Sequence, residues 1–335
     1  MKRCLHRCAA LLLWVCVAAA HCNVFAQVAG TDIPLNAWLL RVHQAARQSV
    51  YTGTFVVSAG GNMASARIWH VCDGAQQLER VESLSGTPRA IFRRNDQVVT
   101  FFPQSRIAVE EVRESLGLFP NLLKSSDSSI GDFYRLKAVG VERIAGFDAE
   151  IYQLVPNDHW RYGYRVWSER KTGLIIQLQT LDMNGAVLEQ SAFSELRLDA
   201  AVNVGKLSRL GNTDGYRVLR PNLKKTTADS QGWVLLRPVD GFKPMGCYER
   251  QVASAEGASF NGQNTMQWVF SDGVATVSLF VEAYDSRRHT REGFTSMGGA
   301  THTSTRRIEN WWATAVGEVP PGTLNAFAQA LERKK

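Results

Sequence analysis

The chain lacks the sequence signatures of the common enzyme classes. It has no Gly-x-Ser-x-Gly nucleophile motif, no glycine-rich phosphate loop ending in Lys-Ser or Lys-Thr, and no His-Glu-x-x-His zinc motif. Histidine is scarce, with seven in 335 residues. His70, Cys72 and Asp73 come closest to a ligand cluster, but no second pair elsewhere completes a metal site. We therefore expect a protein that is not an enzyme, with no metal and no cofactor.

Cysteine is scarce as well. Four of the six cysteines lie within the first 22 residues, which leaves Cys72 and Cys247 in the rest of the chain. In an oxidising compartment these two can form a disulfide. Two separate thiols are the alternative, and spacing alone does not decide between them.

Long apolar runs are missing too. The run at residues 9–20 is shorter than the roughly 20 residues of a membrane-spanning helix. It follows Lys2, Arg3 and Arg7 and precedes the small-residue site that ends at Ala26, a pattern typical of an export signal. We predict that residues 1–26 are a signal peptide and that the mature chain is periplasmic. His21 before Cys22 fits a lipoprotein processing site poorly.

The net charge excludes one class of partner. The formal charge is +7, and removal of the three leader cations lowers it to +4. Such mild basicity suits lipid head groups or an acidic peptide, and it is far from the charge of nucleic-acid-binding proteins. We expect no nucleic acid as a partner. The oligomeric state is left open.

Strand and turn patterns fill most of the chain. Residues 35–48 have helical spacing of apolar residues, and residues 50–198 then alternate between strand and turn. We predict a mainly β (α+β) protein with residues 32–199 as a large antiparallel domain. Residues 200–231, with little periodicity, are the expected linker, and residues 232–333 are a smaller α+β domain.

Apolar residues on the predicted strands suggest a binding face. A curved sheet buries such a face under helices or around a guest, and the helical cover here is thin. The packed core is the alternative. The candidate lipid groove consists of Phe55, Val57, Ile68, Phe101, Leu118, Phe119, Leu122, Val166 and Ile176.

Paired arginines and two aromatic residues form the second candidate set. Around a groove or an interdomain cleft, arginines hold phosphates or carboxylates by charge-assisted hydrogen bonds. Each pair alone is more often a solvated surface. The candidate partner-binding or anionic rim consists of Arg67, Arg93, Arg94, Trp233, Phe242, Arg287 and Arg288.

Several strings, in order and in register, resemble the RseB/MucB family of periplasmic regulators. The resemblance spans both expected domains. The strings are Tyr-Thr-Gly-Thr-Phe-Val at 51–56, Arg-Ile-Trp-His at 67–70, Leu-Ser-Gly-Thr-Pro-Arg at 84–89, Ile-Phe-Arg-Arg at 91–94, Gly-Trp at 232–233, Gly-Phe-Lys at 241–243, the segment 270–282 and Val-Gly-Glu-Val-Pro-Pro at 316–321.

The resemblance implies a fold and a function. The first domain of this chain would be an open antiparallel half-barrel like those of the lipoprotein carriers LolA and LolB, with helices over its concave face. The protein would bind the periplasmic region of a membrane anti-sigma factor (RseA- or MucA-like), protect it from proteolysis and so restrain the envelope-stress sigma factor. Lipopolysaccharide or the acyl chains of mislocalised lipoprotein would release it. Cys72 and Cys247 are not features of that family, and a bridge between them would restrict a hinge.

The sequence leaves two alternative functions. A LolA-like periplasmic lipoprotein carrier or acceptor is favoured by the half-barrel alone, but such a carrier does not need a second domain. A periplasmic hydrolase lacks a nucleophile constellation in this sequence.

Overall fold

The computed structural model describes residues 33–72, 74, 76–112, 119, 122–123, 129–253 and 260–334, with the backbone alone for 251–253 and 260–263. The chain divides into two units, Met1–Thr31 and Asp32–Lys335, and every described residue belongs to the second. The predicted signal peptide lies outside the described residues. None of the described helices is long and apolar enough to cross a membrane.

Twelve strands form the first sheet, in the order β12-β6-β5-β4-β3-β2-β1-β11-β10-β9-β8-β7. All neighbouring pairs are antiparallel except β12 and β6. The sheet is open, because β12 and β7 stand at its two edges. Its strands are β1 (Tyr51–Ala59), β2 (Asn62–Cys72), β3 (Gln77–Ser83), β4 (Ala90–Arg94), β5 (Gln97–Phe102), β6 (Ile107–Val112), β7 (Tyr134–Ile144), β8 (Phe147–Pro156), β9 (Gly163–Glu169), β10 (Ile175–Leu181), β11 (Val187–Leu198) and β12 (Arg217–Leu219).

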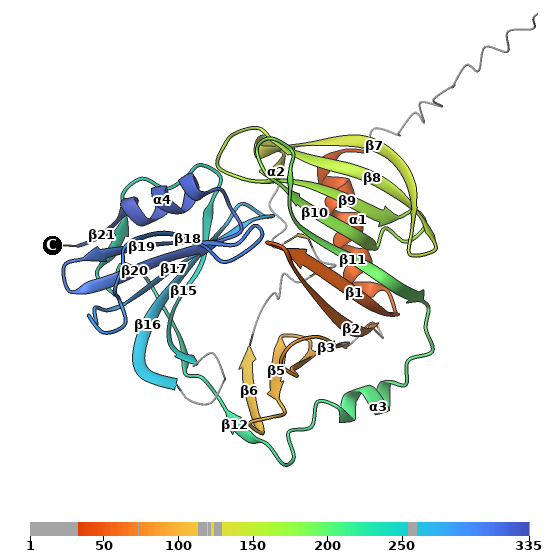
Figure 1. The fold of residues 1–335 in the computed structure, drawn as a ribbon, viewed down its shortest axis with the longest axis horizontal. Helices are drawn as coiled ribbons and strands as arrows, with labels where there is room; N and C mark the ends of the chain where they lie inside the picture. Colours follow the sequence, from red (N-terminus) through yellow and green to blue (C-terminus); the bar gives the residue numbers. More distant parts are fainter. Residues whose placement is uncertain are drawn as a thin grey trace, which may run out of the picture. The chain divides into compact units, whose positions relative to one another are not determined.

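Helix α1 (Leu35–Gln48) covers one face of this sheet, over β2 and β10 (Figure 1). Pro34 precedes its first turn, which suits the fixed φ of proline. Trp38, Leu39 and Val42 recur at helical spacing and are buried against the sheet. The sequence prediction of this helix and of its apolar face is confirmed. A four-residue helix, α2 (Ile130–Phe133), precedes β7.

The segment 200–231, predicted as a linker, carries regular structure. It contains α3 (Val204–Arg209), β12 and β13 (Leu223–Thr226). The Asn203 side chain accepts a hydrogen bond from the backbone N–H of Lys206 and so caps α3, and Leu207 is buried against Phe92 and Phe101. Elements of three to six residues are too short for hydrophobic periodicity to reveal them.

Seven antiparallel strands form the second sheet, in the order β13-β15-β16-β17-β20-β19-β18. Helix α4 (Pro321–Ala330) packs along β19, β20 and β17 (Figure 1). A separate two-stranded sheet pairs β14 (Trp233–Leu235) with β21 (Leu331–Arg333). The remaining strands are β15 (Lys243–Ala253), β16 (Phe260–Ser271), β17 (Thr276–Ala283), β18 (Gly293–Ser296), β19 (His302–Ile308) and β20 (Trp311–Gly317).

Each sheet has its own apolar core. Phe270, Leu324 and Phe327 are central to the core of the second sheet, under α4. The first sheet has two clusters beneath α1 and a further cluster under α3. The predicted fold class, a mainly β protein with an open antiparallel sheet under helices and a smaller α+β part, is confirmed.

A polar cluster with a buried histidine lies on β2, β3 and β4. His70 is fully buried, stacks on Tyr51 at 4.9 Å between ring centroids, and has its Nδ1 2.7 Å from the Ser49 carbonyl oxygen. Glu79 pairs in register with both His70 and Arg93. Burial raises the pKa of Glu79 to about 7, with Arg93 opposing, and burial lowers the pKa of His70 to about 4.

The raised pKa of Glu79 gives the fold a pH dependence. Because the fold favours the protonated Glu79 carboxyl, its contribution to the free energy of unfolding is fully present below the unfolded-state pKa. That contribution is lost as the pH rises through about 7. We expect the Glu79→Gln variant to be more stable than the unchanged chain at pH 8, with a smaller difference at pH 5. Urea midpoints at the two pH values measure this. Equal midpoint shifts at both pH values would contradict the assignment.

Candidate functional site

A turn of the second sheet is bound to the first-sheet part of the chain by one carboxylate. Asp272, between β16 and β17, accepts hydrogen bonds on Oδ2 from Arg161 Nε at 2.9 Å and from the Tyr134 hydroxyl at 3.0 Å. Its Oδ1 accepts the backbone N–H groups of Val274 and Ala275, at 2.9 and 2.7 Å. The same side chain therefore shapes the turn and joins it to β7 and to the loop before β9.

The Arg161–Asp272 ion pair is completely withdrawn from solvent, with both side chains 0% exposed. Arg161 also donates to the Asp240 carbonyl oxygen at 2.6 Å and to the Asp158 carboxylate, and its guanidinium lies 4.5 Å from the Phe133 ring centroid. Removing one member of such a pair typically costs about 3–5 kcal/mol, because an unpaired charge stays buried. Burial, with Asp272 beside it, raises the pKa of Tyr134 well above its ordinary value.

Further contacts surround this pair. The Thr323 hydroxyl of α4 donates to the Trp160 carbonyl oxygen at 2.6 Å, and the Tyr162 hydroxyl lies 2.9 Å from His302 Nε2. His302 is buried on β19, and burial lowers its pKa. Val274 packs with the core residues beneath α1.

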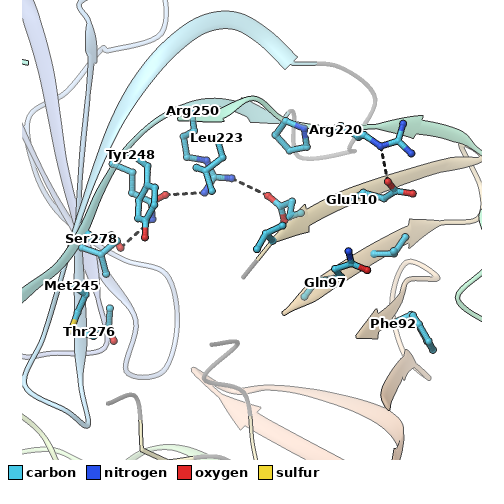
Figure 2. Close-up of a pocket in the computed structure, with 18 of the residues that line it drawn as sticks. Phe92, Gln97, Glu110, Arg220, Leu223, Met245, Tyr248, Arg250, Thr276 and Ser278 are labelled. Atoms are coloured by element: carbon cyan, nitrogen blue, oxygen red, sulfur yellow. Dashed lines mark hydrogen bonds and ion pairs between the residues drawn. The ribbon is translucent and has the colours of Figure 1, made fainter. Parts of the chain in front are cut away.

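A large cavity opens beside this junction, between the two sheets. Its volume is about 1590 Å³, above the roughly 300–1,000 Å³ of typical small-molecule sites. It therefore has room for a polypeptide segment. Residues of both sheets and of the segment between them form its walls (Figure 2). They include Phe92, Arg94, Gln97, Val99, Glu110, Glu111, Val112, Arg209, Arg220, Leu223, Met245, Tyr248, Arg250, Val269, Ser271, Val274, Thr276, Ser278, Phe280, Val316 and Glu318.

Four of the charged side chains on the cavity wall are paired with one another. Glu110 pairs with Arg220 at 2.7 Å, and Glu111 pairs with Arg250 at 3.2 Å (Figure 2). Arg250 Nη1 also donates to the Gln267 side chain at 2.9 Å. With these carboxylates and guanidiniums paired, apolar side chains such as Val269 and Phe280 and polar uncharged ones such as Ser278 and Thr276 offer much of the remaining contact surface.

One continuous segment joins the edges of the two sheets along this cavity. Strand β12 pairs in parallel with Ile107–Val109 of β6, and β13 pairs antiparallel with β15. Only Arg220, Pro221 and Asn222 separate these two strands. We call residues 217–226 the strap. The strap holds one side of the cavity covalently, whereas noncovalent contacts around Asp272 hold another part of its wall.

The predicted groove residues are mostly core residues beneath α1. Ile68 and Ile176 are fully buried with Ala45 and Ala46 of α1, and Val166 and Leu122 pack with Trp38. Phe119 lies against Phe55 and Phe193, with ring centroids 5.5 and 5.1 Å apart. Val57 is half-buried on β1, and Leu118 lies outside the described residues.

Phe101 was assigned to the wrong face. Strand register aligns Ile68 with Val81, Val81 with Ile91, and Ile91 with Thr100. Since neighbouring residues of a strand point to opposite faces, Phe101 lies on the face opposite Ile68. It packs there with Phe92 and Leu207, and its ring centroid is 5.1 Å from that of Tyr216.

The predicted rim residues do not form one surface. Trp233 and Phe242 are 2% and 4% exposed and belong to the core of the second sheet, so their assignment to a rim was wrong. Their aromatic side chains bury more area in that core than a surface position would allow.

The five rim arginines are dispersed. Arg67 lies near the Trp69 ring on β2, Arg93 donates to the Asn95 carbonyl oxygen, and Arg94 donates to the Ser208 hydroxyl. Arg287 and Arg288 follow β17 and pair with Asp285. Among these five, Arg94 alone lines the cavity.

The remaining thiols are free. Cys72 lies on β2 of the first sheet and Cys247 is buried on β15 of the second, so the disulfide left open by the sequence is not formed. Burial raises the pKa of Cys247 to about 11. No group of three or more His, Cys, Asp or Glu side chains arranged to hold a metal occurs in the part of the chain that the structure describes.

Sequence reasoning missed Arg161 and Asp272. A signal existed in Trp160-Arg161-Tyr162, where a charge stands between two aromatic residues. Asp272 stands in Ser271-Asp272-Gly273, a combination typical of a turn, and nothing in that string marks it as part of a buried ion pair. The arrangement as a whole defines a class of protein: two β-sheet parts that enclose a cavity suited to binding a polypeptide.

Comparison with known proteins gives the family. The model of the MucB/RseB N-terminal domain matches residues 34–210, and that of the MucB/RseB C-terminal domain matches residues 227–332. The chain belongs to the MucB/RseB family.

Two curated relatives illustrate the similarity. The sigma factor AlgU regulatory protein MucB of Pseudomonas aeruginosa is 27% identical over 306 residues, which cover 88% of this chain and 89% of MucB. The sigma-E factor regulatory protein RseB of Salmonella typhimurium is 24% identical over 324 residues, covering 96% and 98%. A solved complex of Pseudomonas aeruginosa MucA and MucB shares the fold, with a TM-score of 0.66, 23% identity, and coverage of 90% of this chain and 99% of that one.

The core position of Trp233 leads to a stability prediction. We expect Trp233→Ala to destabilise the second-sheet part by about 3–5 kcal/mol, because a large cavity replaces the ring. Leu236, which is exposed, is the matched control, and its replacement by Ala should change stability by less than about 0.5 kcal/mol. Chemical denaturation measures both. Unchanged stability of the Trp233→Ala variant would contradict the assignment of Trp233 to the core.

Proposed function

We propose that this chain is a periplasmic regulator that binds the periplasmic region of a membrane anti-sigma factor of the MucA or RseA kind in the cavity between its two sheets. Binding protects that region from regulated proteolysis and so restrains the envelope-stress sigma factor. Support comes from membership of the MucB/RseB family, from relatives named as sigma factor regulators, and from a relative solved in complex with MucA.

The cavity is the observation that carries this proposal. Its size exceeds that of a small-molecule site, and its walls mix apolar side chains with ion pairs that are already matched. A protease requires an extended, accessible segment, so a regulator that covers the segment acts without a catalytic group. The strap adds a strand edge to the wall at β13, where an extended peptide can form backbone hydrogen bonds.

Lipid release is the second part of the proposal. Lipopolysaccharide or lipoprotein acyl chains would enter the first sheet beneath α1, among the groove residues other than Phe101. In the described residues this space is filled, since Phe119 lies against Phe55 and Phe193. Acyl chains would therefore have to displace Phe119. A dedicated lipoprotein carrier would need that space open, which favours the regulator over the carrier.

Cavity variants test the proposed site. Leu223 and Met245 line the cavity and are both exposed to solvent. Charged replacements should repel an apolar segment, and we expect Leu223→Asp with Met245→Glu to weaken binding by tenfold or more, about 1.4 kcal/mol. Fluorescence anisotropy with a labelled periplasmic anti-sigma segment measures the affinity, and protection of the segment from a protease is the second readout.

Met183→Glu is the matched control, because Met183 is equally exposed but does not line the cavity. It should bind as the unchanged chain does. Failure of the unchanged chain to bind or protect the segment would refute the function. Equal binding by the double variant would refute the site.

A further inference from the structure

The turn that carries Asp272 forms part of the cavity wall and also packs against the core of the first sheet. Its neighbours Ser271, Val274 and Thr276 line the cavity, and Val274 also packs in the core beneath α1. Gly273 has φ +99°, a conformation that glycine adopts readily, and the Ser271 hydroxyl donates to the Ala275 carbonyl oxygen at 2.8 Å. The turn is therefore held in one conformation, and a molecule in the cavity touches it directly.

We propose that Asp272, with Arg161 and Tyr134, forms a latch that positions the cavity wall for partner binding without touching the partner. The latch fixes the second sheet against the first-sheet part and so sets the distance between the cavity walls. This inference rests on the proposed function, and it identifies what controls affinity at that site.

Linkage gives the latch a measurable effect. When only a fraction of the molecules has the binding-competent arrangement, the apparent Kd equals the intrinsic Kd divided by that fraction. A buried charge without its partner is costly in the latched arrangement, so removal of Asp272 should lower the fraction. The strap keeps the sheets connected when the latch opens. By reciprocity, a bound partner favours the closed latch.

Asp272→Asn tests this. We expect the apparent Kd for a labelled periplasmic anti-sigma segment to rise about tenfold or more, which corresponds to a competent fraction near one in ten. Asp285→Asn is the matched control. Asp285 also shapes a turn, by accepting the Arg287 N–H at 3.0 Å, and pairs with Arg288 at 3.3 Å, but all of these residues follow β17 in the second-sheet part. Its affinity should stay unchanged.

Tyr134→Phe is a milder change to the latch, and it keeps the proposal testable if Asp272→Asn folds poorly. It removes one hydrogen bond of 3.0 Å and should raise the Kd less than Asp272→Asn does, in the same direction. Far-ultraviolet circular dichroism and melting curves verify that each variant is folded.

Restoring the arrangement by a crosslink separates positioning from direct contact. The Lys243 ammonium donates to the Ser129 hydroxyl at 3.1 Å across the junction. Cysteines at these two positions, in a Cys72→Ser and Cys247→Ala background, can be joined by a short bis-maleimide. The crosslinked Asp272→Asn protein should bind within about threefold of the crosslinked protein that retains Asp272.

The outcomes are distinct. Unchanged affinity in Asp272→Asn and Tyr134→Phe overturns the latch. So does weak binding that the crosslink fails to restore, because Asp272 would then act locally or touch the partner. No binding by the protein with an intact latch refutes the proposed function instead.

Discussion

The ion pair between Arg161 and Asp272 is the contact on which the arrangement of the two sheets depends. Both side chains are withdrawn from water, so each charge is tolerable only while the other is present. The Tyr134 hydroxyl also donates a hydrogen bond to the Asp272 carboxylate, and the Asp240 carbonyl oxygen accepts one from Arg161. This makes the junction specific: few other arrangements of the two sheets would match these charges and hydrogen bonds at once.

The cavity follows from this junction together with the strap. Two sheets with separate cores would ordinarily move relative to each other. Here residues 217–226 join one pair of sheet edges, while Asp272 holds the β16–β17 turn elsewhere on the same cavity wall. The space between them can receive an extended chain. Family membership and the cavity point to the same activity, which is to bind a segment of an anti-sigma factor.

Much of the fold could be predicted from the sequence, but little of the site. Helix α1, the strands of the first sheet and the closing helix α4 were predictable because their apolar periodicity extends over several turns or strands. The strap and α3 were not, since they are too short to show a period. Phe101 was misplaced because alternation defines two faces without saying which one a helix covers. Two of the partners of Arg161, Asp240 and Asp272, lie 79 and 111 positions away, and only the folded chain brings them together.

Hydrogen–deuterium exchange, with and without a periplasmic anti-sigma segment, tests the central claim most directly. If the segment occupies the cavity, amide exchange should slow in β6, in the strap, in β15 and in the turn at 271–276, so that both sheets are protected in one complex. Protection confined to one sheet, or to surfaces away from the cavity, would contradict the account.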